Sequence, residues 1–162
     1  MNHKLSLLVI FSLAGSMAAE AQTSDAEAEA VINLLGVQKK EAVAKLVPVT
    51  GKDSVAFWKI YDEYQQTTKA NAKARLKLYE GTAMSYQNMT PPVADSLAKM
   101  YFSNRTDQEA TLETYYKKVK SATNSVTAFE FYQAEIYILT QVRAQIMQQI
   151  PAYGAFKAAN RK

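Results

Sequence analysis

The sequence predicts an all-α protein, an elongated antiparallel hairpin or bundle of about four helices. Residues that favour helices, above all Ala, Lys, Glu, Gln and Leu, fill most of the 162-residue chain. Prolines, which end helices, separate long stretches and stand at Pro48, at Pro91 and Pro92, and at Pro151. No segment shows the sustained two-residue alternation of a half-buried strand.

The first 21 residues have the pattern of an export signal. Lys4 gives a positive start, Leu5–Ala14 is apolar, and an Ala-x-Ala motif ends at Ala21. The apolar stretch is about ten residues long, whereas a helix that crosses a bilayer needs roughly 20. We therefore expect cleavage near Ala21 and a periplasmic or secreted protein. A buried N-terminal helix or a retained anchor is the alternative interpretation.

The remaining chain is expected to form a single helical domain over residues 22–150, followed by a flexible C-terminal tail over 151–162. The first helix of this domain is predicted over about residues 25–47, with Pro48 at its end. Gly36 is a point at which this helix could be interrupted.

A long helix is predicted over about residues 52–87. Thr50 is placed to cap it, with Asp53 in the position of the capping-box carboxylate. Its apolar stripe runs from Phe57 to Tyr86 at three- and four-residue steps. Such a helix would be about 50 Å long, more than the roughly 37 Å diameter of a compact globule of this size. An elongated molecule is therefore expected, unless Gly81 breaks the helix.

The stripe of this helix thins in the middle, at Thr68, Ala70 and Ala72, where a four-helix bundle would place Leu or Ile. Either the long helices cross closely there with little apolar filling, or this side is shallow, concave and open to solvent. Because the core is modest in both cases, a homodimer is a reasonable expectation.

The third and fourth helices have clear ends. Thr90 and Pro91 start the third helix, which is predicted to end near Ala122. The fourth helix is predicted over Ser125–Ile150, because Pro151 stops it. Its buried stripe is expected to consist of Phe129, Tyr132, Ile136, Leu139, Val142 and Ile146.

The composition excludes the commonest catalytic and metal chemistries. The chain has no Cys, and its one His is His3 in the expected signal, so the mature protein lacks thiol and imidazole groups. Glu63, Glu130 and Glu135 lie on aromatic segments, but their spacing creates no carboxylate pair. We therefore expect no enzyme, no metal and no cofactor. The net charge of +4, interleaved with acidic residues, is too small to indicate nucleic acid binding.

Three methionines, Met84, Met89 and Met100, flank the turn between the second and third helices. A thioether site for copper(I) is one interpretation. Gap-filling at the tip of a helical hairpin is the interpretation that we favour, because no His or Cys accompanies these residues.

Two aromatic signatures recur in the expected domain. The first, at Phe57–Tyr64, follows Lys40–Val47 and Val49–Thr50, and the second, at Phe131–Glu135, precedes an Ile150–Pro151 ending. In this order and spacing, the segments resemble the Spy/CpxP group of small exported helical proteins, which carry LTxxQ-type motifs. The resemblance extends over nearly the whole expected domain.

The resemblance implies a long-helix hairpin in the periplasm, often dimeric. The best-understood members of the group look like holdase chaperones or stress-sensing accessory proteins that hold clients on a concave face of apolar and basic residues. The residues of the two signatures are expected to belong mainly to the core: Phe57, Trp58, Tyr61, Tyr64, Phe131, Tyr132, Gln133 and Glu135.

Lys69, Lys73 and Lys77 are spaced four residues apart and therefore project from one helical face. We interpret them as a basic strip that attracts acidic or unfolded clients, or alternatively as a solvated face. The chain also has ten tyrosines, which cannot all be buried on one face. The candidate contact residues among them are Tyr115, Tyr116 and Tyr137.

The expected function is that of a non-enzymatic periplasmic accessory protein, an ATP-independent holdase that binds unfolded or partner proteins. The alternative is a sensor or regulatory protein that docks on one envelope or sigma-factor-pathway component. The expected partners are protein clients or that regulatory component, together with a possible second copy of the chain. No integral membrane segment is expected after signal cleavage.

Overall fold

The computed structural model describes residues 25–148, and these residues form an all-α fold, as predicted. The expected signal at 1–21, the Ile150–Pro151 motif and the tail at 151–162 lie outside the described residues. The elements are α1 (Asp25–Leu46), α2 (Gly51–Ser85), the short 3₁₀ helix η3 (Tyr86–Asn88), α3 (Pro91–Ala122) and α4 (Ser125–Met147).

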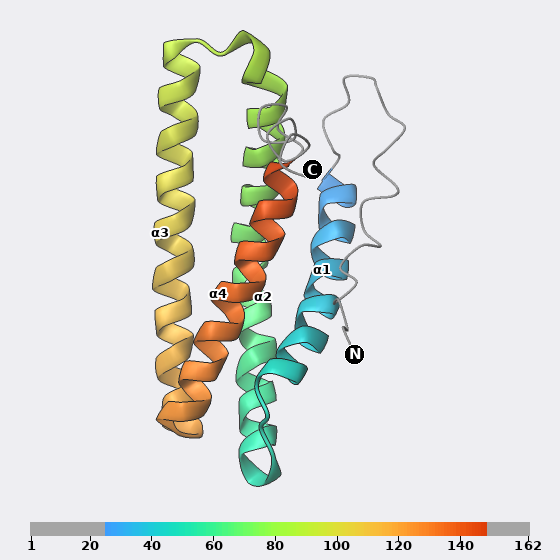
Figure 1. Cartoon of the computed structure of the whole chain (residues 1–162), viewed down its shortest axis with the longest axis vertical. Helices are drawn as coiled ribbons and strands as arrows, with labels where there is room; N and C mark the ends of the chain where they lie inside the picture. The colour runs from blue at the N-terminus through green and yellow to red at the C-terminus, as the bar shows by residue number, and fades with distance from the viewer. Residues whose placement is uncertain (1–24, 149–162) are drawn as a thin grey trace, which may run out of the picture.

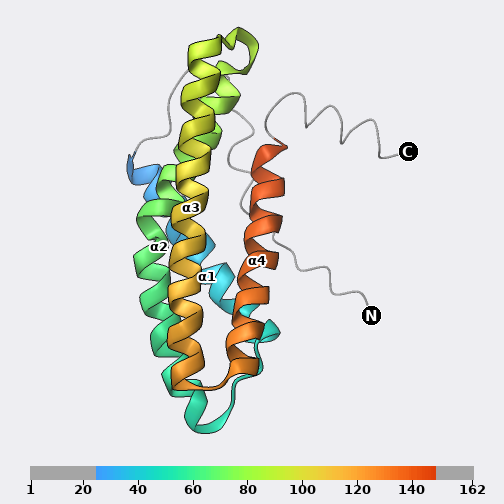
Figure 2. The same cartoon turned by 90° about the vertical axis from the view of Figure 1, so that its left-hand side faces the viewer.

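The four helices alternate in direction and form an elongated antiparallel bundle (Figures 1 and 2). α2 and α3 make the long hairpin, while α1 packs on α2 and α4, and α4 also packs on α3. The tip of the hairpin, residues 78–101, projects beyond the upper ends of α1 and α4 (Figure 1). None of the helices in the described range is long and apolar enough to cross a membrane.

Glycines do not interrupt the helices. α1 continues through Gly36 and α2 continues through Gly81, so the long second helix keeps all of its 35 residues. Gly51 at the start of α2 has a φ of +61°, a conformation that is strained for residues with a Cβ. The glycine that matters for the backbone is therefore the one that starts α2.

The helix caps differ in part from the prediction. Thr50 and Thr90 have the extended backbone of N-cap residues, but neither side chain makes a capping hydrogen bond. The capping box predicted for Thr50 and Asp53 is therefore wrong, although the helix begins at that place. Asn124 caps α4, because its Oδ1 accepts hydrogen bonds from the backbone N–H groups of Val126 and Thr127 at 2.9 and 3.0 Å.

The main core is a cluster of aromatic rings between α2, α3 and α4. Phe131 of α4 meets the rings of Phe57, Tyr61 and Tyr64 edge-on, with centroids 6.3, 6.2 and 5.4 Å away. Tyr64 in turn packs against Tyr115 of α3 at 5.2 Å. Edge-to-face contacts of this kind add to the stabilisation from burial. The aromatic cluster thus joins α4 to the long hairpin.

The stripe predicted for α4 is wrong by one residue position. The helix buries Ala128, Phe131, Ala134, Glu135 and Ile138, whereas Phe129, the start of the predicted stripe, is 56% exposed. One position corresponds to a turn of about 100° around the helix axis. Tyr132, Ile136 and Val142 of the predicted stripe pack at the edge of the core, whereas Phe131 and Glu135, expected in the core from the second aromatic signature, are at its centre.

Polar side chains join α2 and α3 where the stripe of α2 thins. The side-chain amides of Asn71 and Asn104 each donate to the backbone carbonyl of the other, at 3.2 and 3.1 Å. Arg75, one turn after Asn71 on α2, donates to Gln108 Oε1, one turn after Asn104 on α3, at 2.7 Å. Of the two predicted alternatives, close approach of the long helices with little apolar filling agrees with these contacts, and their polar character was not predicted.

Candidate protein-binding surface

A groove of about 800 Å³ runs along the outside of α3 and α4. α3 contributes residues at helical three- and four-residue steps, and α4 contributes two aromatic residues. The principal lining residues are Phe102, Arg105, Glu109, Glu113, Tyr116, Phe129 and Tyr132. We call this feature the α3–α4 groove.

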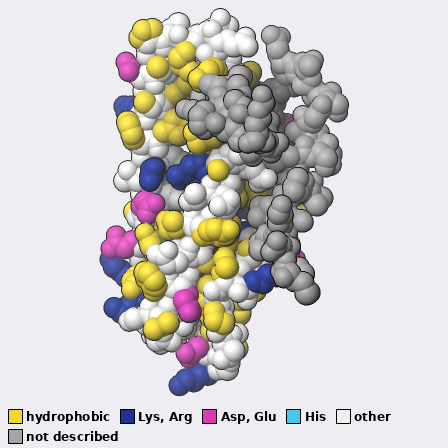
Figure 3. Space-filling view, viewed as in Figure 1, with side chains coloured by type: hydrophobic (Ala, Val, Ile, Leu, Met, Phe, Trp, Pro, Cys, Tyr) yellow, Lys and Arg dark blue, Asp and Glu magenta, His cyan; other side chains and the backbone are white. Residues whose placement is uncertain are grey.

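The α3–α4 groove combines exposed aromatic rings with charges of both signs. Phe102 is 72% exposed and Phe129 is 56% exposed, whereas Tyr116 and Tyr132 are half-buried. On the face that α3 and α4 form in Figure 3, hydrophobic side chains gather in patches between basic and acidic ones. A surface that leaves large aromatic side chains in water has a contact function more often than one with scattered aliphatic residues.

Only part of this groove was predicted from the sequence. Tyr116 was a candidate contact, and Tyr132 was assigned to the core. Phe129 was also predicted to be core, and the rotation of α4 places it in the groove instead. Phe102 was missed, although it follows Tyr101 of the predicted third helix and therefore lies about 100° away from the apolar stripe. An aromatic residue on a polar face is the signal that would have found it.

The basic strip contacts α1 and is not a free cationic face. Lys69 lies 2.8 Å from Glu29, Lys73 lies 3.4 Å from Asp25, and Lys77 is paired with Asp25 as well. The hydrogen bond from Lys77, followed by the hydrogen bond from Lys73, lowers the pKa of the Asp25 carboxyl. The three lysines therefore hold the first turns of α1 against α2, and neither alternative considered for the strip included this role.

The three candidate tyrosines are in different environments. Tyr115 is buried, which makes its assignment as an exposed contact wrong; its hydroxyl donates to Glu63 Oε1 at 3.1 Å. Lys118 also donates to Glu63 at 2.6 Å, and this bond lowers the pKa of the Glu63 carboxyl. Tyr116 lines the α3–α4 groove. Tyr137 is 56% exposed on α4 and is not among the groove residues.

The signature residues are mostly core, with one exception. Phe57, Tyr61, Tyr64, Phe131 and Glu135 are buried, while Trp58 and Tyr132 lie half-buried at the edge of the core. Gln133 is exposed, so its assignment to the core is wrong. It stands two positions after Phe131, on the opposite side of the helix, because two residues turn an α-helix by about 200°.

Glu135 forms a buried ionic site within the core. The hydroxyl of Tyr61 donates to Oε1 at 3.2 Å, and the Lys39 ammonium lies 2.7 Å from Oε2, although the angles at Oε2 are poor for a hydrogen bond. The same ammonium lies 4.8 Å from the centre of the Tyr64 ring. The carboxylate is thus surrounded by one cation and by aromatic groups, an arrangement that positions α1 against α4.

Metal-binding groups are not assembled among the described residues. No cluster of three or more His, Cys, Asp or Glu side chains there has the geometry of a metal site. Met84, Met89 and Met100 are all exposed at the hairpin tip, so the prediction that they fill gaps is wrong. They add apolar surface to the tip.

Comparison with protein-family profiles, with characterised proteins and with solved structures finds no match to this chain. The resemblance to the Spy/CpxP group therefore stays a prediction.

Proposed function

We propose that this protein is a non-enzymatic accessory protein that binds unfolded or partner proteins without ATP and works outside the cytoplasm. The observation that carries this proposal is the pair of exposed phenylalanines, Phe102 and Phe129, in the α3–α4 groove. The export pattern of the first residues and the resemblance to the Spy/CpxP group support the same proposal.

The physical basis is the transfer of aromatic surface out of water. Full burial of one Phe side chain contributes about 1.5–3 kcal/mol, so two rings can hold an apolar client segment weakly and reversibly. The rings are flanked by charges of both signs, from Arg105, Glu109 and Glu113. Charged residues next to the apolar segment of a client can therefore form ion pairs with the groove, whatever their sign. Weak apolar contacts with charges of both signs at the edge favour low specificity, so that the groove binds many clients and not a single one.

The test is the aggregation of a chemically denatured reporter protein, followed by light scattering in the presence of the purified protein. The wild type at equimolar amounts and in several-fold excess is expected to suppress aggregation, because the groove shields exposed apolar segments. The double variant Phe102→Ser/Phe129→Ser is expected to lose most of this effect. Circular dichroism verifies that the variant remains helical.

Tyr137→Ser is the matched control, since Tyr137 lies on the same helix as Phe129 and has the same exposure of 56%. This variant is expected to behave like the wild type. Equal suppression by the wild type and by the double phenylalanine variant would exclude the groove as the client site. One stoichiometric partner in a pull-down from envelope extract, without suppression, would favour the regulatory alternative.

A second copy of the chain is the competing occupant of the groove. If the wild type is a dimer in sedimentation experiments and Phe102→Ser/Phe129→Ser is a monomer, the groove is a subunit interface. That outcome would remove the proposal for client binding at this surface.

A further inference from the structure

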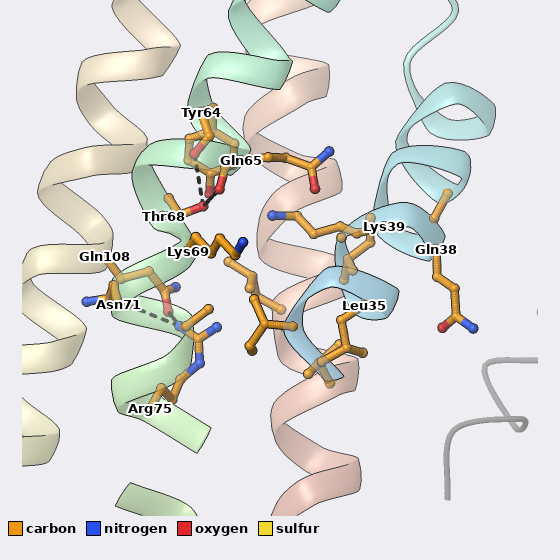
Figure 4. Close-up of a pocket in the computed structure, with 17 residues that line it drawn as sticks. Leu35, Gln38, Lys39, Tyr64, Gln65, Thr68, Lys69, Asn71, Arg75 and Gln108 are labelled. Carbon is orange, nitrogen blue, oxygen red and sulfur yellow. Dashed lines mark hydrogen bonds between the residues drawn. The ribbon is translucent and has the colours of Figure 1, made fainter. Parts of the chain in front are cut away.

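A cavity of about 90 Å³ lies in the middle of the bundle, between the aromatic cluster and the hairpin tip. All four helices line it (Figure 4). It lies beside Thr68 and Ala72, the small residues at which the stripe of α2 thins. The small side chains of α2 thus leave a space that the other helices do not fill.

The walls of the cavity have two chemical characters. α1 and α4 contribute the aliphatic side chains, including Leu35, Ile138 and Val142, and α1 adds the polar side chains of Gln38 and Lys39. α2 and α3 contribute polar side chains, among them Arg75 and Gln108. Figure 4 shows Arg75, Asn71 and Gln108 grouped together on the α2–α3 side, opposite Leu35 of α1. A ligand that fits this space would be apolar at one end and polar at the other.

Three cationic side chains line the cavity, and two of them are neutralised by carboxylates. Lys39 is paired with Glu135 at 2.7 Å, and Lys69 is paired with Glu29 at 2.8 Å. Arg75 has no ion pair among the described residues. The cavity therefore has an excess of positive charge at Arg75.

The two hydrogen bonds of Arg75 leave much of its guanidinium unused. Both come from Nη1, to Asn71 Oδ1 at 3.3 Å and to Gln108 Oε1 at 2.7 Å, and both acceptors are neutral amides. A guanidinium has five N–H donors in a planar fork that matches a carboxylate. Burial lowers the pKa of Arg75, and the positive charge of Arg143 on α4 acts in the same direction. An anion beside Arg75 would oppose both effects.

We propose that this cavity binds a small monocarboxylate of two to four carbons, with its carboxylate on Arg75 and its hydrocarbon part among the aliphatic side chains of α1 and α4. The volume sets the size, because about 90 Å³ corresponds to roughly six to nine water-sized volumes of about 10–15 Å³ each, and a carboxylate of two to four carbons has about four to six non-hydrogen atoms. The aliphatic wall disfavours inorganic anions, and the cations disfavour ligands that carry an ammonium group.

The access route lies between α1 and α2. An open groove on the outside of these two helices shares Ile32, Gly36, Gln65 and Lys69 with the cavity. Gly36 has no side chain to close this wall, and a Cβ there would lie 3.0 Å from Gln65 Oε1. A small molecule would therefore enter past the long side chains of Gln65 and Lys69.

The test is a titration of the ¹⁵N-labelled full domain with butyrate, with the neutral isostere butyramide as the matched ligand control. Butyrate is expected to cause saturable shifts of amides around Ala72, Gln108 and Leu139, with a dissociation constant in the millimolar range. Butyramide is expected to bind about tenfold more weakly or less, because it lacks the charge that pairs with Arg75.

Two variants separate the roles of charge and space. Arg75→Gln is expected to reduce the affinity for butyrate by about tenfold or more, while Lys99→Gln, which removes an exposed cation of α3 outside the cavity, leaves it unchanged. Ala72→Leu fills the cavity and is expected to abolish binding while the domain stays folded, so the proposal remains testable if Arg75→Gln unfolds. Absence of cavity shifts up to about 50 mM butyrate, equal binding of the two ligands, or unchanged binding by Arg75→Gln would overturn the proposal.

Discussion

Glu135 and Lys39 show how one charged pair shapes the core. The carboxylate of Glu135 is fully buried, and Lys39 reaches it from α1, which is far away in the sequence. Two desolvated charges attract each other strongly, but each was removed from water to make the pair. The pair therefore contributes little net stability, whereas either charge alone in this place is costly. Its contribution is to specify how α1 and α4 pack.

Lys39→Met is expected to lower the free energy of unfolding by about 3–5 kcal/mol, because it leaves the Glu135 carboxylate buried without a counter-charge. Lys39→Met/Glu135→Leu is expected to recover most of that loss, since the second change removes the uncompensated charge. Urea denaturation of both variants measures the difference. A double variant as unstable as the single one would contradict this account of the pair.

The buried phenols make stability sensitive to high pH. Burial, followed by the negative charge of Glu135, raises the pKa of Tyr61 and of Tyr64. In the unfolded chain a phenol ionises near pH 10, whereas in the folded protein these two stay protonated at that pH. Above that pH the folded state binds more protons than the unfolded state. The contribution of the two phenols to the free energy of unfolding is therefore complete below about pH 10 and is lost as the pH rises further.

Tyr64→Phe is therefore expected to reduce the loss of stability at high pH. Each such phenol contributes a slope of about 1.4 kcal/mol per pH unit above its unfolded pKa. Unfolding free energies from urea curves between about pH 8 and 11 give the slope for the wild type and for the variant. The same slope in both proteins would show that Tyr64 ionises normally in the folded state.

At the scale of the element, α2 is the longest helix and carries residues for three different neighbours. Its 35 residues run without a break, with Gly51 at the start and Gly81 near the end. Its first half supplies the aromatic cluster, and the three lysines of its second half hold α1. Gly51 has a positive φ, which favours glycine, whereas Gly81 has the helical backbone that alanine prefers. Substitution by alanine is therefore expected to have opposite effects at the two positions.

Gly81→Ala is expected to stabilise the protein by about 0.5–1 kcal/mol, because a helical glycine is replaced and the added Cβ meets nothing within 4 Å. Gly51→Ala is expected to destabilise it by about 1–2 kcal/mol, since a Cβ is strained at a φ of +61°. Urea denaturation gives both values. Shifts of the same sign would contradict the assigned backbone conformations.

At the scale of the whole molecule, stability is expected to fall towards the hairpin tip. The aromatic cluster is enclosed by several helices, whereas the tip at 78–101 projects beyond α1 and α4 (Figure 2). Tyr79, Tyr101 and Thr82 join α2 and α3 at the tip: the two rings pack at 5.6 Å, and the hydroxyls of Tyr101 and Thr82 are hydrogen-bonded at 2.9 Å. Fewer buried contacts allow local opening.

Backbone amides at 82–100 are expected to exchange with deuterium about tenfold faster, or more, than those at 57–64 and 112–119, after correction for intrinsic rates. Peptide-resolved hydrogen exchange at neutral pH measures this difference. Thr82→Val is expected to widen it, because Tyr101 loses its hydroxyl partner. Uniform protection along α2 would instead indicate a tip covered by a partner or by a second copy.

Much of the fold, and less of the candidate site, could be predicted from the sequence. The start of α3 at Pro91 and the start of α4 at Ser125 were both predicted, because proline, glycine and polar caps act within one turn. The α3–α4 groove could not be predicted from the sequence. It depends on the rotation of α4, which moves Phe129 from the expected core to the surface.

From the sequence it was possible to predict that the described residues are helical, where their helices begin, and that the bundle is elongated. These properties follow from local propensity and from helix length, which need no partner. Which helix faces are buried depends on how the helices pack, because a charged side chain can enter the core when another helix supplies the opposite charge. Lys39 of α1 supplies the positive charge for the buried Glu135 of α4. In the opposite sense, Asp25 and Glu29 of α1 supply negative charges that pair with the lysines of α2.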